Sequence, residues 1–250
     1  MPPANHFLTG ADAYALHRPT YPDTFVAALA DLAPARRLAL DVGCGTGQMS
    51  VLLAERFDAV IATDASAAQI AQATPHPKVR YAQAAAETVS APVGSVDLIV
   101  AAQAAHWFDL PAFHAAARTM AAPGAVIALV TYGVMRIHDP DVDPRFQRFY
   151  GPDMAPYWPP ERRHVENGYR DLPFPFPELP FPAAEIVRDW TLADLLGYVE
   201  TWSATRRAIA AGAGGLIEAF RADMTAAWGD PDRPRRVTWP LSGRIGRIAG

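Results

Sequence analysis

One short segment of the sequence has glycine at every second position. This segment, Asp41-Val-Gly-Cys-Gly-Thr-Gly47, begins at the end of an apolar run, 38–42, and precedes a helical pattern. Glycine lets the backbone turn sharply, and without a Cβ it lets a ligand approach the main chain. Asp64 follows Gly43 by 21 residues and ends the next apolar run, where a carboxylate can accept hydrogen bonds from both hydroxyls of a ribose. These features predict a site for an adenosine-type cofactor.

The spacing of the glycines narrows the choice of cofactor. A dinucleotide-binding loop requires Gly-x-Gly-x-x-Gly, but Gln48 stands three residues after Gly45 and the third glycine is one place early, at Gly47. The Gly-Lys-Ser/Thr sequence of nucleotide hydrolases is also absent from the chain. A nicotinamide-dependent oxidoreductase with an aberrant loop stays open as an alternative. So does a protein that binds the cofactor without turnover.

Apolar runs and helical patterns alternate around this loop. The alternation is typical of a parallel sheet with crossover helices. Helices are expected after the glycines, from Ser66 to about Pro75, and from Asp109 until Pro123-Gly124 stops the last of them. Strands are expected at 38–42, 59–63, 79–82, 96–101 and 125–131. The glycine loop then lies at the carboxyl end of a parallel strand.

The second half of the chain differs in composition. Residues 140–182 contain 11 of the 24 prolines, and this density prevents a continuous helix or a central strand. Aromatic residues between Phe146 and Tyr169 indicate an ordered cap across the end of the sheet rather than a solvated linker. Beyond it we expect a strand at 185–190, helices at 192–203 and 216–228, and a strand at 236–240.

The composition excludes several classes of protein. With 22 basic and 26 acidic residues the formal charge is −4, which argues against a nucleic-acid partner. A hydrophobic fraction of 50% excludes general disorder. Cys44 is the only cysteine, so an internal disulfide and a cysteine-rich zinc site are excluded. No apolar run reaches the roughly 20 residues of a membrane helix, and the N-terminus lacks the order of a secretory signal. We expect a cytoplasmic protein without a metal or a membrane partner.

With these features the sequence resembles the class I S-adenosylmethionine-dependent methyltransferases. The resemblance covers about residues 35–132 and rests on Asp-x-Gly-x-Gly-x-Gly at 41–47, Ala85-Ala-Glu87, Val96-Asp-Leu-Ile-Val100 and Ala122-Pro-Gly124. It implies an α/β fold with a Rossmann-like seven-stranded, mostly parallel sheet, helices on both faces and a proline-rich cap insertion. It also implies S-adenosylmethionine as the cofactor. The expected binding residues are Tyr14, Arg18, Asp41, Gly43, Gly45, Gly47, Asp64, Ser66, Gln69, Ala86, Glu87 and Gln103.

A narrower resemblance extends beyond this core. Three segments are similar to the methyltransferase type 11 branch that contains the trans-aconitate methyltransferases: Tyr14-x-x-x-Arg18-Pro-x-Tyr21-Pro22, Gln103-x-x-His106-Trp107-Phe108 and Thr201-Trp-Ser203. The proline-rich insert departs from that branch. We expect four parts: an N-terminal lid segment at 1–34, the cofactor-binding core at 35–135, the cap insertion at 136–183, and a part at 184–250 that completes the sheet and the substrate pocket.

Methyl transfer is an in-line displacement that depends on alignment and a dry pocket. A carboxylate acceptor needs no base at pH 7, whereas a phenol or a carbon acid does. We expect a small-molecule acceptor that is methylated on a carboxylate or hydroxyl oxygen. His106 is the candidate catalytic residue, as an orienting group or a base, although a purely structural role stays open.

The expected substrate contacts are Tyr21, His106, Trp107 and Trp202, while Arg162, Arg163, Arg206 and Arg207 are candidates to bind an acidic substrate. Tyr14 and Tyr21 are expected to cover the cofactor with their rings, and Arg18 to pair with its carboxylate. An ordinary surface arm with two packed tyrosines is the alternative for this segment. The oligomeric state stays open.

Overall fold

The computed structural model describes residues 19–248, which divide into two compact units. We call them the sheet unit and the helical unit. The sheet unit consists of 20–133, 163–185 and 241–248, and the helical unit consists of Pro19, 134–162 and 186–240. Each unit is therefore assembled from separate stretches of the chain. The four-part division expected from the sequence stays a prediction.

Five parallel strands form the centre of the sheet unit. They are β1 (Leu38–Val42), β2 (Ala59–Asp64), β3 (Val79–Gln83), β4 (Val96–Ala102) and β5 (Ala121–Tyr132), and they lie in the order β3-β2-β1-β4-β5. In register, Leu40 lies between Ile61 on β2 and Ile99 on β4. All three side chains are buried, as expected for strands that are covered on both faces.

A long antiparallel strand completes the sheet. Residues 241–247 of β9 (Arg235–Arg247) pair with β5, from Leu241 opposite Tyr132 to Arg247 opposite Val126. The sheet has nine strands among the described residues rather than the seven expected, because the two-residue strands β6 (Arg136–Ile137) and β7 (Glu178–Leu179) and also β8 (Glu185–Trp190) pair with β9. The expected Rossmann-like, mostly parallel α/β architecture is confirmed.

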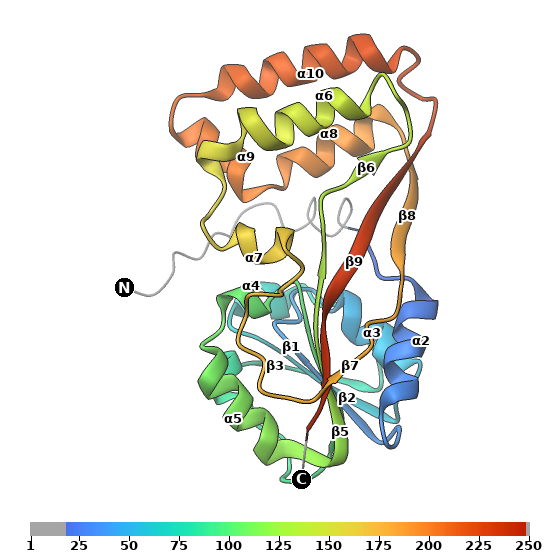
Figure 1. Ribbon diagram of the computed structural model, residues 1–250, viewed down its shortest axis with the longest axis vertical. Coiled ribbons are helices and arrows are strands. Elements are labelled where there is room, and N and C mark those ends of the chain that lie inside the picture. The colour runs from blue at the N-terminus through green and yellow to red at the C-terminus, as the bar shows by residue number, and fades with distance from the viewer. Residues whose placement is uncertain (1–18, 249–250) are drawn as a thin grey trace. The chain divides into compact units, whose positions relative to one another are not determined.

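Helices cover both faces of this sheet. Figure 1 shows α5 (Leu110–Met120) on one face, and α2 (Asp23–Leu32) and α3 (Gln48–Ala54) on the other. The side chain of Asp109 caps α5 by accepting a hydrogen bond from Ala112 N at 3.2 Å, and Ser66 caps α4 (Ala67–Ala71) in the same way. Both caps agree with the sequence analysis.

Several boundaries differ from those expected. Helix α2 lies within the segment expected to be a lid, and it buries Phe25, Val26, Leu29 and Ala30. Helix α4 already ends at Ala71, before Pro75. Helix α5 ends at Met120, and β5 begins at Ala121 instead of after Gly124. Of residues 121–124, only Ala121 pairs with β4, opposite Val96, before the register shifts to Leu98 opposite Val126.

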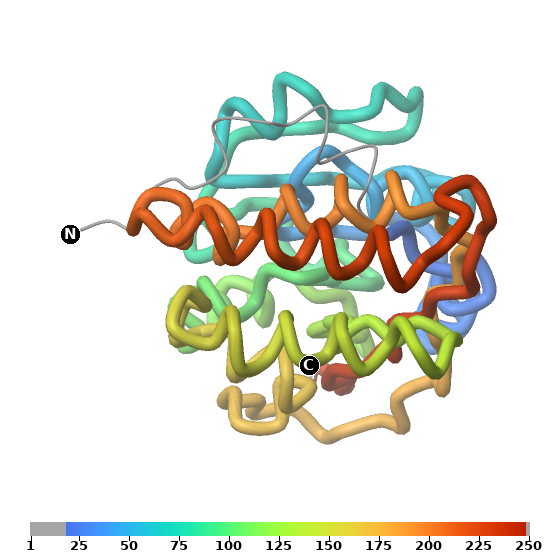
Figure 2. The backbone as a smooth tube through the Cα atoms, turned by 90° about the horizontal axis from the view of Figure 1, so that it is seen from above, coloured from blue at the N-terminus to red at the C-terminus, as the bar shows by residue number. Residues whose placement is uncertain are grey.

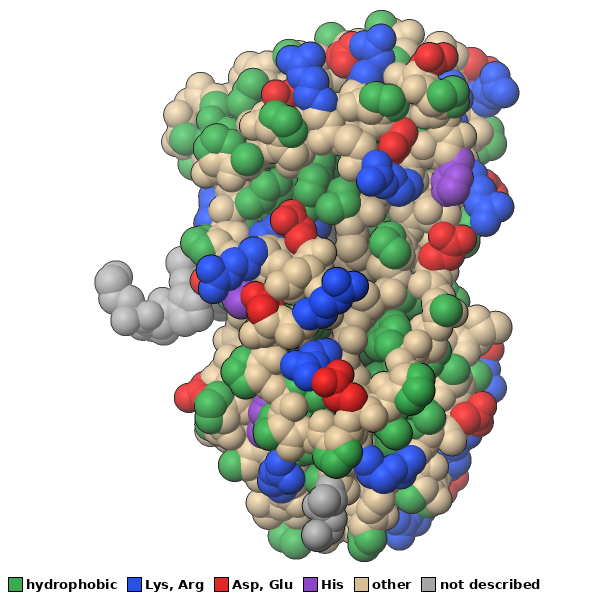
Figure 3. Space-filling model, viewed as in Figure 1, with side chains coloured by type: hydrophobic (Ala, Val, Ile, Leu, Met, Phe, Trp, Pro, Cys, Tyr) green, Lys and Arg blue, Asp and Glu red, His purple; other side chains and the backbone are tan. Residues whose placement is uncertain are grey.

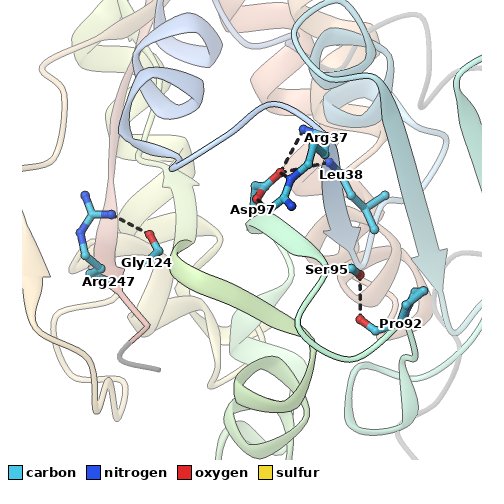
Figure 4. A network of polar contacts seen from close by, with 7 residues as sticks. All are labelled: Arg37, Leu38, Pro92, Ser95, Asp97, Gly124 and Arg247. Atoms are coloured by element: carbon cyan, nitrogen blue, oxygen red, sulfur yellow. Dashed lines mark hydrogen bonds and ion pairs between the residues drawn. The ribbon is translucent and has the colours of Figure 1, made fainter.

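A polar network joins the amino ends of the strands (Figure 4). The buried carboxylate of Asp97 accepts hydrogen bonds from the guanidinium of Arg37 at 2.6 Å and from the backbone N–H of Arg37 at 3.0 Å. Leu38 N donates to the same carboxylate at 3.4 Å. Burial raises the pKa of Asp97, but these hydrogen bonds outweigh it and hold the pKa below its usual range. Arg247 donates to Gly124 O at 2.6 Å, which joins β9 to the start of β5.

The helical unit packs around aromatic side chains. Its helices are α6 (Asp143–Arg148), α8 (Leu192–Glu200), α9 (Ser203–Ala210) and α10 (Gly214–Trp228), and Figure 2 shows α10 running alongside α6. Phe149 stacks on Phe220 with ring centroids 3.8 Å apart. The helix expected at 192–203 is two helices, because the chain is extended at Trp202 between α8 and α9.

Short elements occupy the proline-rich stretch. Besides α6 and β7, they are the π-helical turn η3 (Phe149–Asp153), the 3-10 turn η4 (Ala155–Tyr157) and α7 (Arg162–Glu166). No helix among residues 19–248 combines the length and the apolar character needed to cross a membrane. Within the same residues no group of three His, Cys, Asp or Glu side chains is arranged to hold a metal ion.

Candidate functional site

The three glycines of the loop after β1 all have positive φ, at 71° for Gly43, 55° for Gly45 and 87° for Gly47. A Cβ on Gly43 would lie 2.4 Å from the Cβ of Ala104, and one on Gly47 would lie 2.2 Å from Oη of Tyr81. These two positions therefore exclude a side chain on packing grounds. A Cβ on Gly45 would meet only Oε1 of Gln69, at 3.7 Å. The middle of the loop is thus the part of its backbone that a ligand can approach.

Asp64, at the end of β2, holds this loop. Its Oδ2 accepts a hydrogen bond from Gly45 N at 2.9 Å, and its Oδ1 accepts one from Ser66 N at 2.8 Å. Gly43 N also donates to the carbonyl of Thr63, at 2.7 Å. The loop, Asp64 and Ser66 therefore lie together at the carboxyl edge of the sheet, where ligands bind in open α/β sheets.

Asp41 lies at the head of the loop and is fully buried. Its Oδ2 accepts a hydrogen bond from Oγ of Ser50 at 2.5 Å. Burial raises the pKa of Asp41 to about 7, the charge of Asp64 adds to this effect, and the hydrogen bond from Ser50 opposes it. Burial also raises the pKa of the neighbouring Cys44 thiol, so this cysteine stays protonated.

Three buried polar atoms near the loop have no hydrogen-bond partner among residues 19–248: Oδ1 of Asp41, Oγ1 of Thr63 and Oε1 of Gln69. Unsatisfied buried polar atoms are costly in a folded protein and call for an explanation. All three atoms can accept a hydrogen bond when Asp41 is ionised. Together with the approachable backbone at Gly45, they fit a ligand that carries an ammonium group and hydroxyl groups. S-adenosylmethionine has both.

The other expected cofactor residues lie after β3 and β4. Ala86 is buried in the 3-10 turn η1 (Ala86–Thr88). Glu87 accepts a hydrogen bond from Asp109 N at 2.8 Å, so its carboxylate also supports the start of α5. Gln103 has a φ of 59°, and its side-chain amide donates to the carbonyl of Tyr132 at 3.2 Å. A left-handed conformation at a non-glycine residue is costly and is often found at functional sites.

His106 lies in the 3-10 turn η2 (Ala105–Trp107), just beyond the carboxyl end of β4. Its Nδ1 is 2.8 Å from Oη of Tyr169. The ring of Trp107 lies 4.9 Å from the imidazole, centroid to centroid, and 41% of Trp107 is exposed. An exposed tryptophan beside a half-buried histidine departs from ordinary core packing.

Two further residues, Tyr169 and Tyr81, contact this site and were not expected from the sequence. Tyr169 is fully buried and comes from the stretch 163–185 of the sheet unit, which the sequence analysis assigned to the cap. The only local signal was the Asn167-Gly168 pair before it, which is typical of a turn. Tyr81 donates to the carbonyl of Thr74 at 2.8 Å and stands against Gly47. The sequence pattern at 79–82 predicted only that Tyr81 lies in a strand.

The remaining expected site residues are distributed over both units. Tyr21 is buried in the sheet unit, with its ring centroid 6.4 Å from that of Tyr132 at the end of β5. Trp202 belongs to the helical unit and is buried against Trp158, with ring centroids 5.2 Å apart. Tyr14 and Arg18 lie outside the described residues.

The four candidate arginines are also divided between the units. Arg162 stacks over Trp158 with its guanidinium carbon 4.9 Å from the ring centroid, inside the helical unit. Arg206 and Arg207 belong to α9 of the helical unit, and Arg163 belongs to the sheet unit. Arg162 is therefore engaged with aromatic side chains of its own unit, through a cation–π contact.

Several known proteins are similar to this chain in sequence and structure. A family model described as a methyltransferase domain matches residues 39–124. A provisionally named methyltransferase of Dictyostelium discoideum is 31% identical over 223 residues, which cover 88% of this chain and 85% of that protein. A solved structure from Anaeromyxobacter dehalogenans, provisionally named a type II methyltransferase, is 52% identical, with a TM-score of 0.86 and coverage of 93% of this chain and 98% of that one.

Proposed function

This chain belongs to the class I S-adenosylmethionine-dependent methyltransferases, and we propose that it transfers the methyl group to an oxygen atom of a small molecule. The acceptor oxygen belongs to a carboxylate or a hydroxyl group. We further propose that the chain is related to the branch that contains the trans-aconitate methyltransferases. The motif Gln103-x-x-His106-Trp107-Phe108 supports this relationship.

The cofactor, when bound, supplies a methyl group on a positively charged sulfur atom. In our proposal the backbone at Gly45 lies against its methionine end, and Asp64 accepts hydrogen bonds from its ribose. The carboxylate of Asp41 attracts its positively charged part, since buried opposite charges interact strongly. Gly43, Gly47, Ser66 and Gln69 shape this part of the site, and Ala86, Glu87 and Gln103 enclose the adenine side. Tyr14 and Arg18 are proposed to complete the enclosure.

The observation that carries the choice of acceptor is the place of His106. It stands on the turn after β4, three residues beyond Gln103, and its Nδ1 lies 2.8 Å from the hydroxyl of Tyr169. A histidine held in this way at the carboxyl edge of the sheet can orient an acceptor oxygen next to the cofactor. The exposed ring of Trp107 supplies an apolar wall beside it. Tyr21, which belongs to the same unit, is proposed as a further wall of the pocket.

The charge distribution is consistent with a small acceptor. On the face drawn in Figure 3, Lys and Arg side chains are interspersed with Asp and Glu side chains. The formal charge of the whole chain is −4. Binding to a nucleic acid depends largely on neutralising its phosphates with clustered basic side chains.

Product analysis tests this proposal. The protein is incubated with methyl-labelled S-adenosylmethionine and a set of small carboxylic acids, phenols, amines and carbon acids. We expect label in a methyl ester, which alkali releases as methanol, or in an aryl or alkyl ether. Label found only on nitrogen or carbon contradicts oxygen as the acceptor.

A further inference from the structure

The hydroxyl of Tyr169 lies 2.8 Å from Nδ1 of His106, within hydrogen-bonding distance. The two rings are 5.8 Å apart between centroids and are inclined by 39°. Tyr169 is fully buried, whereas His106 is half-buried. The tyrosine is therefore the more enclosed member of the pair, and the histidine is the more accessible one.

The backbone holds Tyr169 in an unusual conformation. Its φ is 63°, directly after Gly168 with a φ of 70°. Tyr169 N donates to the carbonyl of His164 at 2.8 Å, and Leu172 N donates to the carbonyl of Tyr169 at 3.2 Å. A tyrosine in the left-handed region persists only where the surroundings determine it strongly. The residue whose hydroxyl contacts His106 therefore has a strained backbone conformation.

The hydrogen bond has a preferred direction. In a neutral imidazole one ring nitrogen carries the proton and the other accepts. A phenol hydroxyl, with a pKa of about 10, is a better donor than a neutral imidazole N–H, and an imidazole nitrogen is a better acceptor than a phenol oxygen. Tyr169 therefore donates to Nδ1. The hydrogen bond made by one nitrogen decides which tautomer is present, so the proton of His106 lies on Nε2.

We propose that Tyr169 is a positioning residue that holds His106 as an Nε2–H donor, and that this donor binds one oxygen of a carboxylate acceptor. This inference rests on the proposed function and narrows its acceptor class to carboxylates. The acceptor oxygen forms a bond to the methyl carbon, while the bond from that carbon to sulfur breaks and leaves its electron pair on sulfur. No proton is released, because a carboxylate at neutral pH carries none. A phenolic acceptor would instead require a lone pair on Nε2, which is the opposite tautomer.

The first test needs no substrate. The nitrogen shifts of the imidazole are measured at pH 8 in protein labelled at its seven histidines, and the His106 signals are assigned by their loss in His106→Gln. We expect Nε2 of His106 in the range of a protonated nitrogen and Nδ1 in the range of an acceptor. In Tyr169→Phe we expect the signals to shift toward a mixture of tautomers. A lone pair on Nε2 in the unsubstituted protein overturns the proposal, as does a Tyr169→Phe spectrum that does not change.

The second test uses turnover of a carboxylate acceptor. Glutamine at 106 retains an N–H close to the place of Nε2 but cannot act as a base. We expect His106→Gln to keep kcat/KM within about 5-fold of the unsubstituted enzyme, and His106→Ala to lose about 10 to 100-fold, as when one hydrogen bond to a charged group is removed. Equal losses in both variants overturn the donor role.

A double-mutant cycle tests whether Tyr169 acts through His106. We expect Tyr169→Phe to lower kcat about 3 to 30-fold with little change in KM, and to have no further effect in the His106→Ala background. If Tyr169→Phe lowers kcat equally in both backgrounds, Tyr169 supports the stability of the fold instead of the position of His106, and the positioning role is overturned. Tyr157→Phe, on the turn η4 of the helical unit, is the control for the loss of a tyrosine hydroxyl and is expected to leave turnover unchanged.

The two proposals fail in distinguishable ways. If no carboxylate is methylated, the acceptor class is wrong, but the nitrogen shifts of the free protein still decide the tautomer and the role of Tyr169 in fixing it. If carboxylates are methylated and the shifts show an unprotonated Nε2, the proposed function holds and the inference is overturned.

Discussion

Oδ2 of Asp64 accepts a hydrogen bond from the backbone N–H of Gly45 at 2.9 Å. This bond connects the acid at the end of β2 with the middle of the loop after β1. The two strands pair in parallel up to Val42 opposite Thr63, and this side-chain hydrogen bond holds the loop just beyond the last pair. The acid that we propose as the ribose ligand therefore also determines the shape of the glycine loop. A change at Asp64 is expected to disturb both halves of the cofactor site.

Replacing Asp64 tests this coupling. We expect Asp64→Ala to weaken the binding of S-adenosylhomocysteine about 10 to 100-fold, because hydrogen bonds to a charged group contribute about 1.5 to 3 kcal/mol. Titration calorimetry measures the affinity. Asp58→Ala, at an exposed position directly before the same strand, is the control. Equal affinities of Asp64→Ala and Asp58→Ala would show that Asp64 does not contact the cofactor.

The loop glycines differ from glycines that merely form turns. Gly47→Ala would place a methyl group 2.2 Å from Oη of Tyr81, whereas Gly94→Ala, with a similar φ of 67°, would meet no atom within 4 Å. We expect Gly94→Ala to lower the free energy of unfolding by about 1 to 2 kcal/mol from backbone strain alone. Gly47→Ala should lower it by more, and it should also weaken cofactor binding. Urea unfolding and calorimetry compare the two variants, and similar losses in both would contradict the packing argument at Gly47.

The buried acid Asp41 predicts a pH dependence of stability. Its pKa is about 7 in the folded protein, with burial as the largest cause, and about 3.9 in an unfolded chain. Between these values the folded state retains a proton that the unfolded state has lost. The free energy of unfolding therefore falls as the pH rises through this window, by roughly 1.4 kcal/mol per pH unit at the steepest, and it levels off above it.

The variant Asp41→Asn isolates this contribution, because it has no titrating carboxyl group at this position. We expect the unsubstituted protein to have its highest free energy of unfolding relative to Asp41→Asn near pH 4 and its lowest near pH 8. Urea unfolding at four or five pH values measures it. Parallel curves for the two proteins would mean that Asp41 ionises normally in the fold.

The network around Asp97 is expected to stabilise the fold without affecting binding. Asp97→Ala leaves the backbone N–H groups of Arg37 and Leu38 without their acceptor, and we expect a loss of about 2 to 4 kcal/mol. Asp31→Ala removes the acid of an exposed pair with Arg36 and should cost less than about 1 kcal/mol. Both variants should bind S-adenosylhomocysteine normally at a temperature where they are folded. A binding defect confined to Asp97→Ala would extend the site to the amino ends of the strands.

The sequence predicts the first half of the sheet well for a local physical reason. Strands β1 to β4 agree within one residue with the apolar runs. β1, β2 and β4 are largely buried, whereas β3 lies at the edge of the sheet and is largely exposed, and glycine or polar residues stand at the ends of all four. Helix α2 was not predicted, because it directly follows the Tyr14-to-Pro22 motif, which suggested a lid segment. Pro22 stands at its start, and the helix has only ten residues.

Strand β9 shows why the second half is harder to predict. Pro240, Gly243 and Gly246 interrupt its pattern and predicted an end at 240, but the strand continues to Arg247. The glycines belong there because a Cβ on Gly243 would lie 2.0 Å from the carbonyl oxygen of Leu129, and one on Gly246 would lie 2.7 Å from the ring of Phe174. Both neighbours are distant in sequence, so no local pattern reveals the need for glycine.

The candidate site also has one part that the sequence predicts and one part that it does not. The glycine loop, Asp64 and Ser66 are recognisable because consecutive βα units bring them to one edge of the sheet. The contact between His106 and Tyr169 joins residues 63 positions apart, and Tyr169 lies in a short segment between the proline runs at 159–160 and 173–177. Its place depends on tertiary packing, which the sequence pattern does not encode locally.

A crystal structure with bound S-adenosylhomocysteine tests the central claim most directly. We predict the ribose hydroxyls within hydrogen-bonding distance of the Asp64 carboxylate, and the amino-acid end of the ligand against the backbone of residues 43–47, close to Asp41. A ligand bound elsewhere, or an Asp64 carboxylate that is hydrogen-bonded only to Gly45 and Ser66 in the complex, would contradict the assignment of this loop as the cofactor site.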